Sequence, residues 1–282
     1  MQDAEINETI LVNGEYSADV SIKDRGLQYG HGLFETIAIK NGQLEYWDKH
    51  TARLIRGCQQ LLISPPDPVL LKKEALLLTD QFSSDQKFQA VLKITVTCGE
   101  GGRGYKTPDP QNPTRILSIS KWLYPEKNIE PVVIRLCKSR LSSNATLSGI
   151  KHLNRLEQVL ARSEWSDPDI AEGIMLNGAN HVIEGTMSNL FFVKNNTLCT
   201  PDLTQSGIQG IMREVILELA NQSGFQTSID NFTLTDIFEA DELFLSNSLI
   251  KIWPVKTLIA KETITYNSPG DLTKNLISEL TS

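Results

Sequence analysis

Hydrophobic and polar residues alternate at the start of the chain, as they do in paired strands. Thr9–Val12 is an apolar extended run that meets Asn13-Gly14, a dipeptide favoured in type I′ hairpins, and an extended pattern resumes over Glu15–Ile22. The same hairpin pattern recurs at Ile37–Leu44, with Asn41-Gly42 at the turn. The pattern therefore predicts two antiparallel hairpins in the first 44 residues.

Helical periodicity replaces this alternation from Asp48 onward. Leu54, Cys58, Leu61 and Leu62 recur on one face, and Asp48 is placed to cap the helix. Leu70–Phe82 is predicted as a second amphipathic helix. The chain then returns to strands at Gln89–Thr97 and Thr114–Ser120, separated by a glycine-rich loop at Gly99–Gly104.

The second half reads as short strands with two longer helices. A helix is predicted at Leu153–Trp165 with Leu153, Leu156, Val159 and Leu160 facing inward, and another at Gly210–Ser223. Predicted strands are Val132–Leu136, Gly173–Leu176, His181–Glu184, Leu190–Lys194, Glu242–Ser246 and Ile250–Val255.

This mixture predicts an α+β protein of two domains. Residues 1–121 form a small, mostly antiparallel α+β domain, and residues 132–282 form a larger β-rich domain with helices. The intervening 122–131 carries Pro125, Lys127 and Asn128 and is predicted to be a linker.

Composition narrows the function classes. A net charge of −7 argues against nonspecific nucleic-acid binding, which requires clustered Lys and Arg. No run reaches the roughly 20 apolar residues of a membrane span, and Met1–Asn13 lacks a secretory pattern, so a cytoplasmic protein is expected. The four cysteines and four histidines are scattered, which predicts buried cysteines and no metal site.

Two segments carry candidate chemistry in the second half. Lys151 follows a glycine and precedes a helical pattern, where desolvation lowers the pKa of an amine and frees it for Schiff-base chemistry. A solvated lysine at a helix start is the commoner outcome for one lysine alone. Glu184 lies between apolar runs within Val182–Phe192, and is either a pocket carboxylate or a hairpin rim residue, the rim being commoner.

Two further segments suggest an anion site. In Gly207–Glu214 a glycine turn opens a helix, whose free N–H groups bind phosphate well. Asp24–Thr36 holds three glycines within seven residues, which implies close approach or unusual backbone angles. Arg53 follows on a predicted helix. Its guanidinium is suited either to binding a phosphate through two N–H groups or to forming a surface ion pair.

Taken in order, these four segments resemble the fold-type IV pyridoxal-phosphate family, which includes D-amino-acid aminotransferases, branched-chain aminotransferases and aminodeoxychorismate lyases. The resemblance spans Ile10–Val255. It implies a D-amino-acid aminotransferase-like fold with pyridoxal 5′-phosphate covalently bound to Lys151. The residues that it assigns to the cofactor are Lys151, Glu184 on the ring nitrogen, Arg53 with the N–H groups of Ile211 and Met212 on the phosphate, Ser188 and Asn247.

Within the family, the lyase branch is the more similar. The matching stretches are Gly149–Gln158, Gly101–Tyr105 and Leu245–Leu249. The resemblance implies conversion of 4-amino-4-deoxychorismate to 4-aminobenzoate and pyruvate, with Thr36 beside the reacting carbon as a catalytic partner of Lys151. The implied substrate contacts are Arg103, Tyr105, Tyr29 and Ser248.

Oligomeric state and alternatives also follow from the family. The resemblance implies a homodimer whose Arg103 loop crosses the interface. His31 departs from the lyase pattern, which usually has Asp, and Met212 departs from the threonine of many relatives. The alternatives are a transaminase for D- or branched-chain amino acids, and a non-catalytic cofactor carrier or scaffold.

Overall fold

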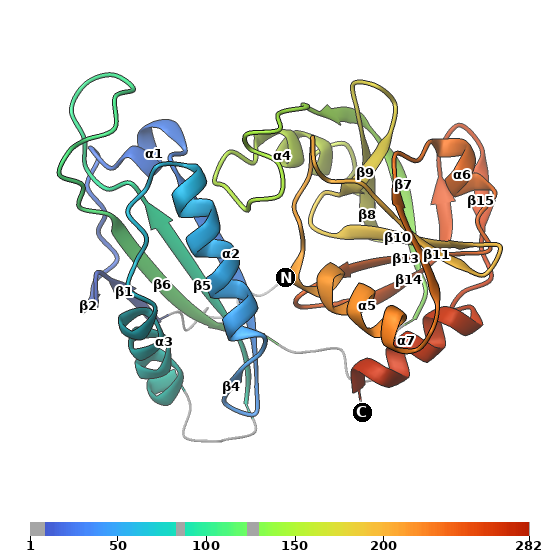
Figure 1. Cartoon of the computed structure of the whole chain (residues 1–282), viewed down its shortest axis with the longest axis horizontal. Helices are drawn as coiled ribbons and strands as arrows, with labels where there is room; N and C mark the ends of the chain where they lie inside the picture. The colour runs from blue at the N-terminus through green and yellow to red at the C-terminus, as the bar shows by residue number, and fades with distance from the viewer. Residues whose placement is uncertain (1–8, 83–87, 123–129, 282) are drawn as a thin grey trace. The chain divides into compact units, whose positions relative to one another are not determined.

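The computed structural model describes residues 9–82, 88–122 and 130–281, which divide into two compact units (Figure 1). The first unit comprises Met1–Tyr124 and Ile150–Asn154, and the second comprises Pro125–Gly149 and Arg155–Ser282. The segment that contains Lys151 therefore groups with the first unit, although it was expected in the second domain. Residues 123–129 of the proposed linker lie outside the described residues, so that boundary stays a prediction.

The first unit is built on a six-stranded sheet whose neighbours are all antiparallel. Its order is β2 (Glu15–Tyr16), β1 (Thr9–Val12), β6 (Thr114–Lys121), β5 (Gln89–Thr97), β3 (Gly32–Lys40) and β4 (Gln43–Leu44). Both predicted hairpins are confirmed. The extended pattern to Ile22 is wrong beyond Tyr16, because the hydroxyls of Ser17 and Ser21 accept backbone N–H groups two residues on and turn the chain.

Three helices belong to this unit: α1 (Arg25–Tyr29), α2 (Trp47–Gln60) and α3 (Pro68–Phe82). Figure 1 shows α2 and α3 beside the sheet, where α2 contacts β3 and α3 contacts β1 and β6. The predicted Asp48 cap is wrong. Tyr46 occupies the cap position in the left-handed region, with φ 52°, and Asp48 lies in the first turn, where its charge still favours the helix dipole.

The second unit contains a closed ring of strands. The ring comprises β7 (Val132–Leu141), β8 (Ile170–Asn177), β9 (Val182–Gly185), β10 (Asn189–Lys194), β13 (Glu242–Asn247) and β14 (Lys251–Ile259). It closes because β9 pairs with both β8 and β10, the latter through Glu184 opposite Asn189. Beyond the ring, β11 (Thr197–Pro201) and β12 (Gln226–Asp230) extend from β10, and β15 (Thr263–Thr265) pairs with β14.

Four helices accompany the ring: α4 (Leu156–Arg162), α5 (Ile211–Gln222), α6 (Leu234–Phe238) and α7 (Asp271–Thr281). The predicted helix start at Leu153 is wrong, because the Leu153 N–H donates to the Gly32 carbonyl and keeps that segment extended. The predicted inward face is also wrong, since Leu156, Val159 and Leu160 are all exposed.

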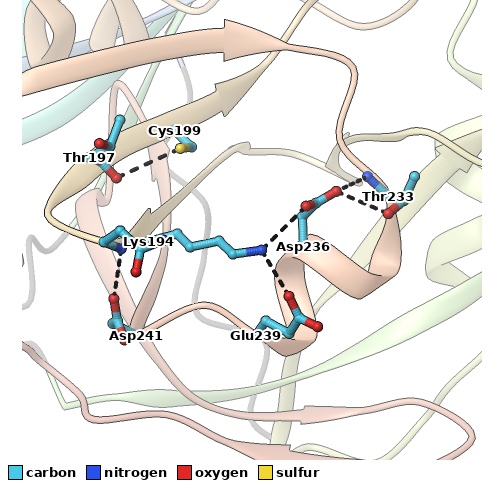
Figure 2. Close-up of polar contacts among 8 residues, drawn as sticks. Lys194, Thr197, Cys199, Thr233, Asp236, Glu239 and Asp241 are labelled. Carbon is cyan, nitrogen blue, oxygen red and sulfur yellow. Dashed lines mark hydrogen bonds and ion pairs between the residues drawn. The ribbon is translucent and has the colours of Figure 1, made fainter.

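Polar contacts fix α6 beside the end of β10 (Figure 2). The N–H and hydroxyl of Thr233 donate to Asp236 Oδ2 at 2.9 and 3.0 Å, which caps the short helix. Lys194 Nζ lies 2.9 Å from Glu239 and 3.5 Å from Asp236. One lysine at the end of the strand thus joins two carboxylates of α6.

Among the described residues, the cysteines, the longer helices and the possible metal ligands bear on the predictions. The four cysteines are free and buried, as expected for small hydrophobic residues. No described helix is both long and apolar enough to cross a membrane, and no group of three or more acidic, histidine or cysteine residues is arranged to hold a metal ion there.

Candidate active site

Lys151 lies in an extended segment that pairs with the start of β3. Its carbonyl accepts from the Phe34 N–H at 2.9 Å, and His152 forms a bridge with Leu33. The ammonium lies 4.3 Å from the centre of the Phe34 ring, which is a cation–π distance. Lys151 is therefore half-buried with a fixed backbone, and the interpretation of a solvated lysine at a helix start is wrong.

Arg53 is held by a buried ion pair. Glu35 Oε1 accepts from Arg53 Nε at 2.8 Å and Oε2 accepts from Arg53 Nη2 at 2.6 Å, and the two side chains are 1% and 4% exposed. His50 Nδ1 lies 2.6 Å from Glu35 Oε2. The surface ion pair considered for Arg53 is wrong, because the pair is buried. Two of the five N–H donors of the guanidinium serve Glu35.

The charges of this group perturb one another. Burial by itself raises the pKa of Glu35, but the Arg53 charge and the hydrogen bonds from His50 and Arg53 outweigh it and lower that pKa from 4.5 to about 2. Burial lowers the pKa of His50, and the hydrogen bond with Glu35 opposes this only in part. Glu35 is thus an ionised carboxylate under Arg53 at neutral pH.

Thr36 follows Glu35 on β3 and points to the opposite face. Successive side chains of a strand alternate, so Thr36 shares a face with Phe34, the ring against which Lys151 Nζ lies. Glu35 shares its face with Leu33 and Ile37 and meets α2. One strand therefore presents the candidate catalytic hydroxyl on one side and supports Arg53 from the other.

Glu184 lies at the point where the strand ring closes. Its Oε2 accepts from the Ile208 N–H at 2.8 Å and from Asn189 Nδ2 at 3.3 Å, and Asn189 Nδ2 also donates to the Ile208 carbonyl at 2.8 Å. Glu184 is 3% exposed, so the rim interpretation is wrong and the pocket carboxylate is favoured. Gly207 adopts φ +86° beside it, where a Cβ would lie 2.8 Å from Ile183 Cγ2.

Two arginines lie within the electrostatic field of Glu184. Burial lowers the pKa of the Arg155 guanidinium, and Glu184 opposes that effect. The same holds for Arg213, where burial is again the largest cause and Asp202 and Glu184 oppose it. Cationic charge around a buried carboxylate favours its ionised form.

The turn after Glu184 is organised by a second buried carboxylate, Glu172. It is 0% exposed and accepts hydrogen bonds from the N–H groups of Thr186 and Met187, at 3.1 Å each, and from the hydroxyl of Ser188 at 3.0 Å. The structure thus places the Ser188 hydroxyl on Glu172. Ser188 is a candidate cofactor residue that also shapes its own turn.

Asn247 organises the neighbouring turn. Its Oδ1 accepts from the N–H groups of Leu249 and Ile250 at 2.9 Å, and its Nδ2 donates to the Met187 carbonyl at 3.1 Å. Asn247 therefore joins the turn at residues 247–250, which includes the half-buried Ser248, to the turn that Glu172 holds.

The first turn of α5 supplies backbone donors. Gly210 is its N-cap, and Ile211 and Met212 are buried residues of the first turn, whose N–H groups have no acceptor within the helix. Gly210 is required here, because a Cβ would lie 2.0 Å from Asn189 Oδ1. The Met212 side chain is buried in the core, so only its backbone N–H points toward the N-terminal end of α5.

Two of the candidate substrate residues, Tyr29 and Tyr105, meet at α1. Tyr29 and Tyr105 form an edge-to-face pair with centroids 5.4 Å apart, and Tyr105 is 84% exposed. Arg103 is exposed in the same loop. The structure therefore brings Tyr29 and Tyr105 together, and their role as substrate contacts stays a prediction.

Sequence reasoning missed several residues of these networks. Glu35, His50, Asn189 and Glu172 were not nominated, although Glu35 and Asn189 stand inside the quoted motifs. The one signal in the sequence was an acidic residue among the apolar residues of a strand. It indicates a buried carboxylate, which requires hydrogen-bonding or charged partners nearby.

The chain is similar to known proteins over nearly its whole length. The model of the class IV amino-transferase family matches residues 32–258. An aminodeoxychorismate lyase of Vibrio harveyi is 38% identical over 95% of this chain and 98% of its own length, and a D-alanine aminotransferase of Bacillus licheniformis is 30% identical over 96% and 95%. The crystal structure of 4-amino-4-deoxychorismate lyase from Pseudomonas aeruginosa superposes with a TM-score of 0.87, at 41% identity over 96% of this chain and 97% of that one.

The chain belongs to the class IV amino-transferase family. The predicted α+β fold of fold-type IV is confirmed. Within the family, two of the three relatives named above are lyases of aminodeoxychorismate.

We expect Glu35→Gln to weaken the first unit and flatten its acid sensitivity. Removing one partner of a buried pair costs about 3–5 kcal/mol at neutral pH. Because the folded-state pKa of Glu35 is lowered to about 2, its stabilisation is present above about pH 4.5 and is lost as the pH falls toward 2. Urea unfolding from pH 7 to pH 2 measures both effects.

Glu15→Gln, at an exposed position of the same sheet, is the matched control. It should leave stability and its pH dependence unchanged. Equal acid sensitivity in wild type and Glu35→Gln would show that Glu35 is not ionised against Arg53.

Proposed function

We propose that this protein is a pyridoxal-phosphate-dependent lyase that converts 4-amino-4-deoxychorismate to 4-aminobenzoate and pyruvate. The observation that carries the proposal is the near full-length similarity to two aminodeoxychorismate lyases, in a chain that retains Lys151, Glu184 and Arg53. A small-molecule substrate and a cytoplasmic location belong to the same proposal.

The residues present fit the cofactor by their chemistry. Its aldehyde requires a primary amine, which Lys151 offers, and its ring nitrogen requires a buried carboxylate, which Glu184 offers. Its phosphate requires a guanidinium and free N–H groups, which Arg53 and the first turn of α5 offer. Ser188 and Asn247 are the further proposed cofactor contacts.

The bound cofactor supplies an electron sink next to the amine-bearing carbon of the substrate. Lys151 Nζ removes the proton from that carbon, and Glu184 holds the proton of the cofactor's ring nitrogen. The bond between the ring carbon and the enolpyruvyl oxygen breaks, and the leaving enolpyruvate takes up a proton to become pyruvate. Loss of the proton and the ether makes the ring aromatic, which drives the reaction.

Substrate recognition is assigned to the loop at residues 99–105 and its neighbours. The substrate has two carboxylates, and Arg103 provides a cationic partner for one of them. Tyr105, Tyr29 and Ser248 are the remaining proposed contacts. Thr36 is proposed to protonate the leaving group together with Lys151.

A homodimer is part of the proposal, with the Arg103 loop reaching a partner subunit. It is supported by α4, which exposes Leu156, Val159 and Leu160 at 75%, 56% and 63%. These residues share one helix face, and an exposed apolar face of this kind marks an interaction site.

Lys151→Ala is expected to abolish product formation. Purified protein is mixed with enzymatically generated 4-amino-4-deoxychorismate, and 4-aminobenzoate is followed by its fluorescence. The control is Lys93→Ala, which removes an exposed lysine 5.7 Å from the same Phe34 ring and should leave turnover unchanged.

A wild-type protein that shows the visible absorbance of bound cofactor and makes no 4-aminobenzoate would overturn the lyase assignment. Amino donors would then be tested with 2-oxoglutarate or pyruvate, because a D-alanine aminotransferase is also 30% identical. Cofactor binding with neither activity would identify a carrier.

Thr36→Val is expected to lower kcat by about 10²-fold, the usual contribution of a positioned acid or base. Thr36→Ser keeps the hydroxyl and should retain most of the activity. Turnover of Thr36→Val equal to that of wild type would remove Thr36 from the proton transfer.

Leu156→Glu with Leu160→Glu is expected to convert the dimer to a monomer in sedimentation velocity, because it places charge on the apolar face of α4. Ile22→Glu changes an equally exposed residue of the first unit and should leave the dimer intact. A wild-type protein that sediments as a monomer would contradict the proposed assembly.

A further inference from the structure

The backbone of Arg25 is fixed where the glycine-rich loop begins. Asp24 caps α1, since its Oδ1 accepts from the Gly26 N–H at 2.7 Å. Its Oδ2 accepts from the hydroxyls of Thr97 and Thr114 at 2.8 and 2.7 Å, which ties the cap to β5 and β6. The Arg25 N–H then donates to the Gly99 carbonyl at 2.8 Å.

The Arg25 side chain reaches the far end of the same loop. Nη1 donates to the Gly104 carbonyl at 3.0 Å and Nη2 to the Tyr105 carbonyl at 2.9 Å. Arg25 is 2% exposed, and its guanidinium lies 4.9 Å from the centre of the Tyr29 ring. Gly101 packs against it so closely that a Cβ would lie 2.7 Å from Arg25 Cδ.

His31 orients this guanidinium. Arg25 Nε donates to His31 Nδ1 at 3.2 Å, and His31 Nε2 lies 2.8 Å from the Leu61 carbonyl. A carbonyl only accepts and a guanidinium only donates, so Nε2 carries the hydrogen and Nδ1 is bare. The neutral imidazole therefore links Arg25 to the C-terminal end of α2.

The start of the loop is bridged by Glu100 to Asp24 and by Gly99 to Asn112, and Tyr105 packs on Tyr29 at its end. Between these points the loop is open: Arg103, Gly104 and Tyr105 are exposed, and a Cβ added at Gly102 or Gly104 would meet no other atom within 4 Å. In the described part of the chain, the Arg25 guanidinium forms no ion pair with an acidic side chain and bonds instead to two loop carbonyls and one histidine. A buried cation bonded to carbonyls is a strong tie, because charge-assisted hydrogen bonds are about twice as strong as neutral ones.

We propose that Arg25, oriented by His31, is a positioning residue that fixes the backbone at Gly104 and Tyr105, and so sets how Arg103 and Tyr105 meet the substrate. This inference rests on the proposed function for its substrate part. It also assigns a role to His31, where the lyase pattern usually has Asp: each side chain offers an acceptor to Arg25, but only histidine also donates to Leu61.

The first readout is the loop itself and needs no activity. Arg103 and Lys106 are exposed trypsin sites in the segment that Arg25 holds. Arg25→Lys keeps the charge but has one nitrogen for three acceptors, and His31→Leu removes the acceptor for Nε. We expect the cleavage rate after Arg103 and Lys106, mapped by mass spectrometry, to rise about tenfold in both, as the loss of about 1.4 kcal/mol of hydrogen bonding would give.

The second readout is the division between KM and kcat on the holoenzyme. Both variants should raise KM about tenfold with kcat and cofactor absorbance little changed, because the tie acts on substrate contacts rather than on proton transfer. His31→Asp again supplies an acceptor for Arg25 Nε and should return cleavage and KM close to wild type. The control is Arg115→Lys, which alters a comparable two-bond contact with Glu74 and should affect neither readout.

The outcomes separate the two proposals. Unchanged cleavage in Arg25→Lys and His31→Leu, with folding verified by circular dichroism, would overturn the role of Arg25 whether or not the enzyme is a lyase. Faster cleavage with unchanged KM would overturn its role in substrate positioning. A wild-type protein without lyase product defeats the proposed function, while the cleavage rates still decide whether Arg25 holds the loop.

Discussion

The pairing of Glu184 with Asn189 is the contact on which the second unit depends, because it joins β9 to β10 and closes the strand ring. The same two side chains meet at Ile208, whose N–H donates to Glu184 and whose carbonyl accepts from Asn189. The segment around Ile208 also pairs with Gly149, through the Gly149 N–H to the Gly207 carbonyl and the Gln209 N–H to the Gly149 carbonyl. Gly149 is two residues from Lys151 along the chain. The contacts that close the ring therefore fix the Glu184 carboxylate and the backbone of the second unit as far as Gly149.

Buried carboxylates recur throughout the candidate site, and each is satisfied differently. Glu35 is balanced by Arg53 and His50, whereas Glu172 is surrounded by N–H and hydroxyl donors. A buried charge without partners is costly, so each of these groups specifies the position of its donors as strongly as the donors specify it. Loss of one donor would not remove the free-energy cost of burying the charge, so the donors are held in place. The turns that carry these donors are therefore stiff. That stiffness suits residues that must hold a ring or a phosphate in one orientation.

The sequence predicted best those elements whose own residues decide their structure. The strand at Gln89–Thr97 was predicted with the bounds that the structure has, because its apolar residues alternate with less buried ones and form one buried face of the sheet. Helix α4 was misjudged because an apolar stripe does not show whether its face packs within the same unit, and Leu156, Val159 and Leu160 are exposed. Helix α1, with five residues, is too short for periodicity to detect. Lys151 was assigned by family resemblance alone, since half-burial against Phe34 depends on a pairing between segments more than 100 residues apart.

Two residues, Met212 and His31, depart from the family pattern. Met212 stands where many relatives have threonine. It lies in the first turn of α5, where its backbone N–H has no acceptor within the helix and its side chain fills the core. His31 replaces a carboxylate, and it keeps an acceptor on Nδ1 while adding a donor on Nε2. At position 31 the hydrogen bond from Arg25 Nε is thus accepted by an imidazole nitrogen. What this position requires is an acceptor atom within reach of Arg25 Nε, and more than one residue type offers such an atom.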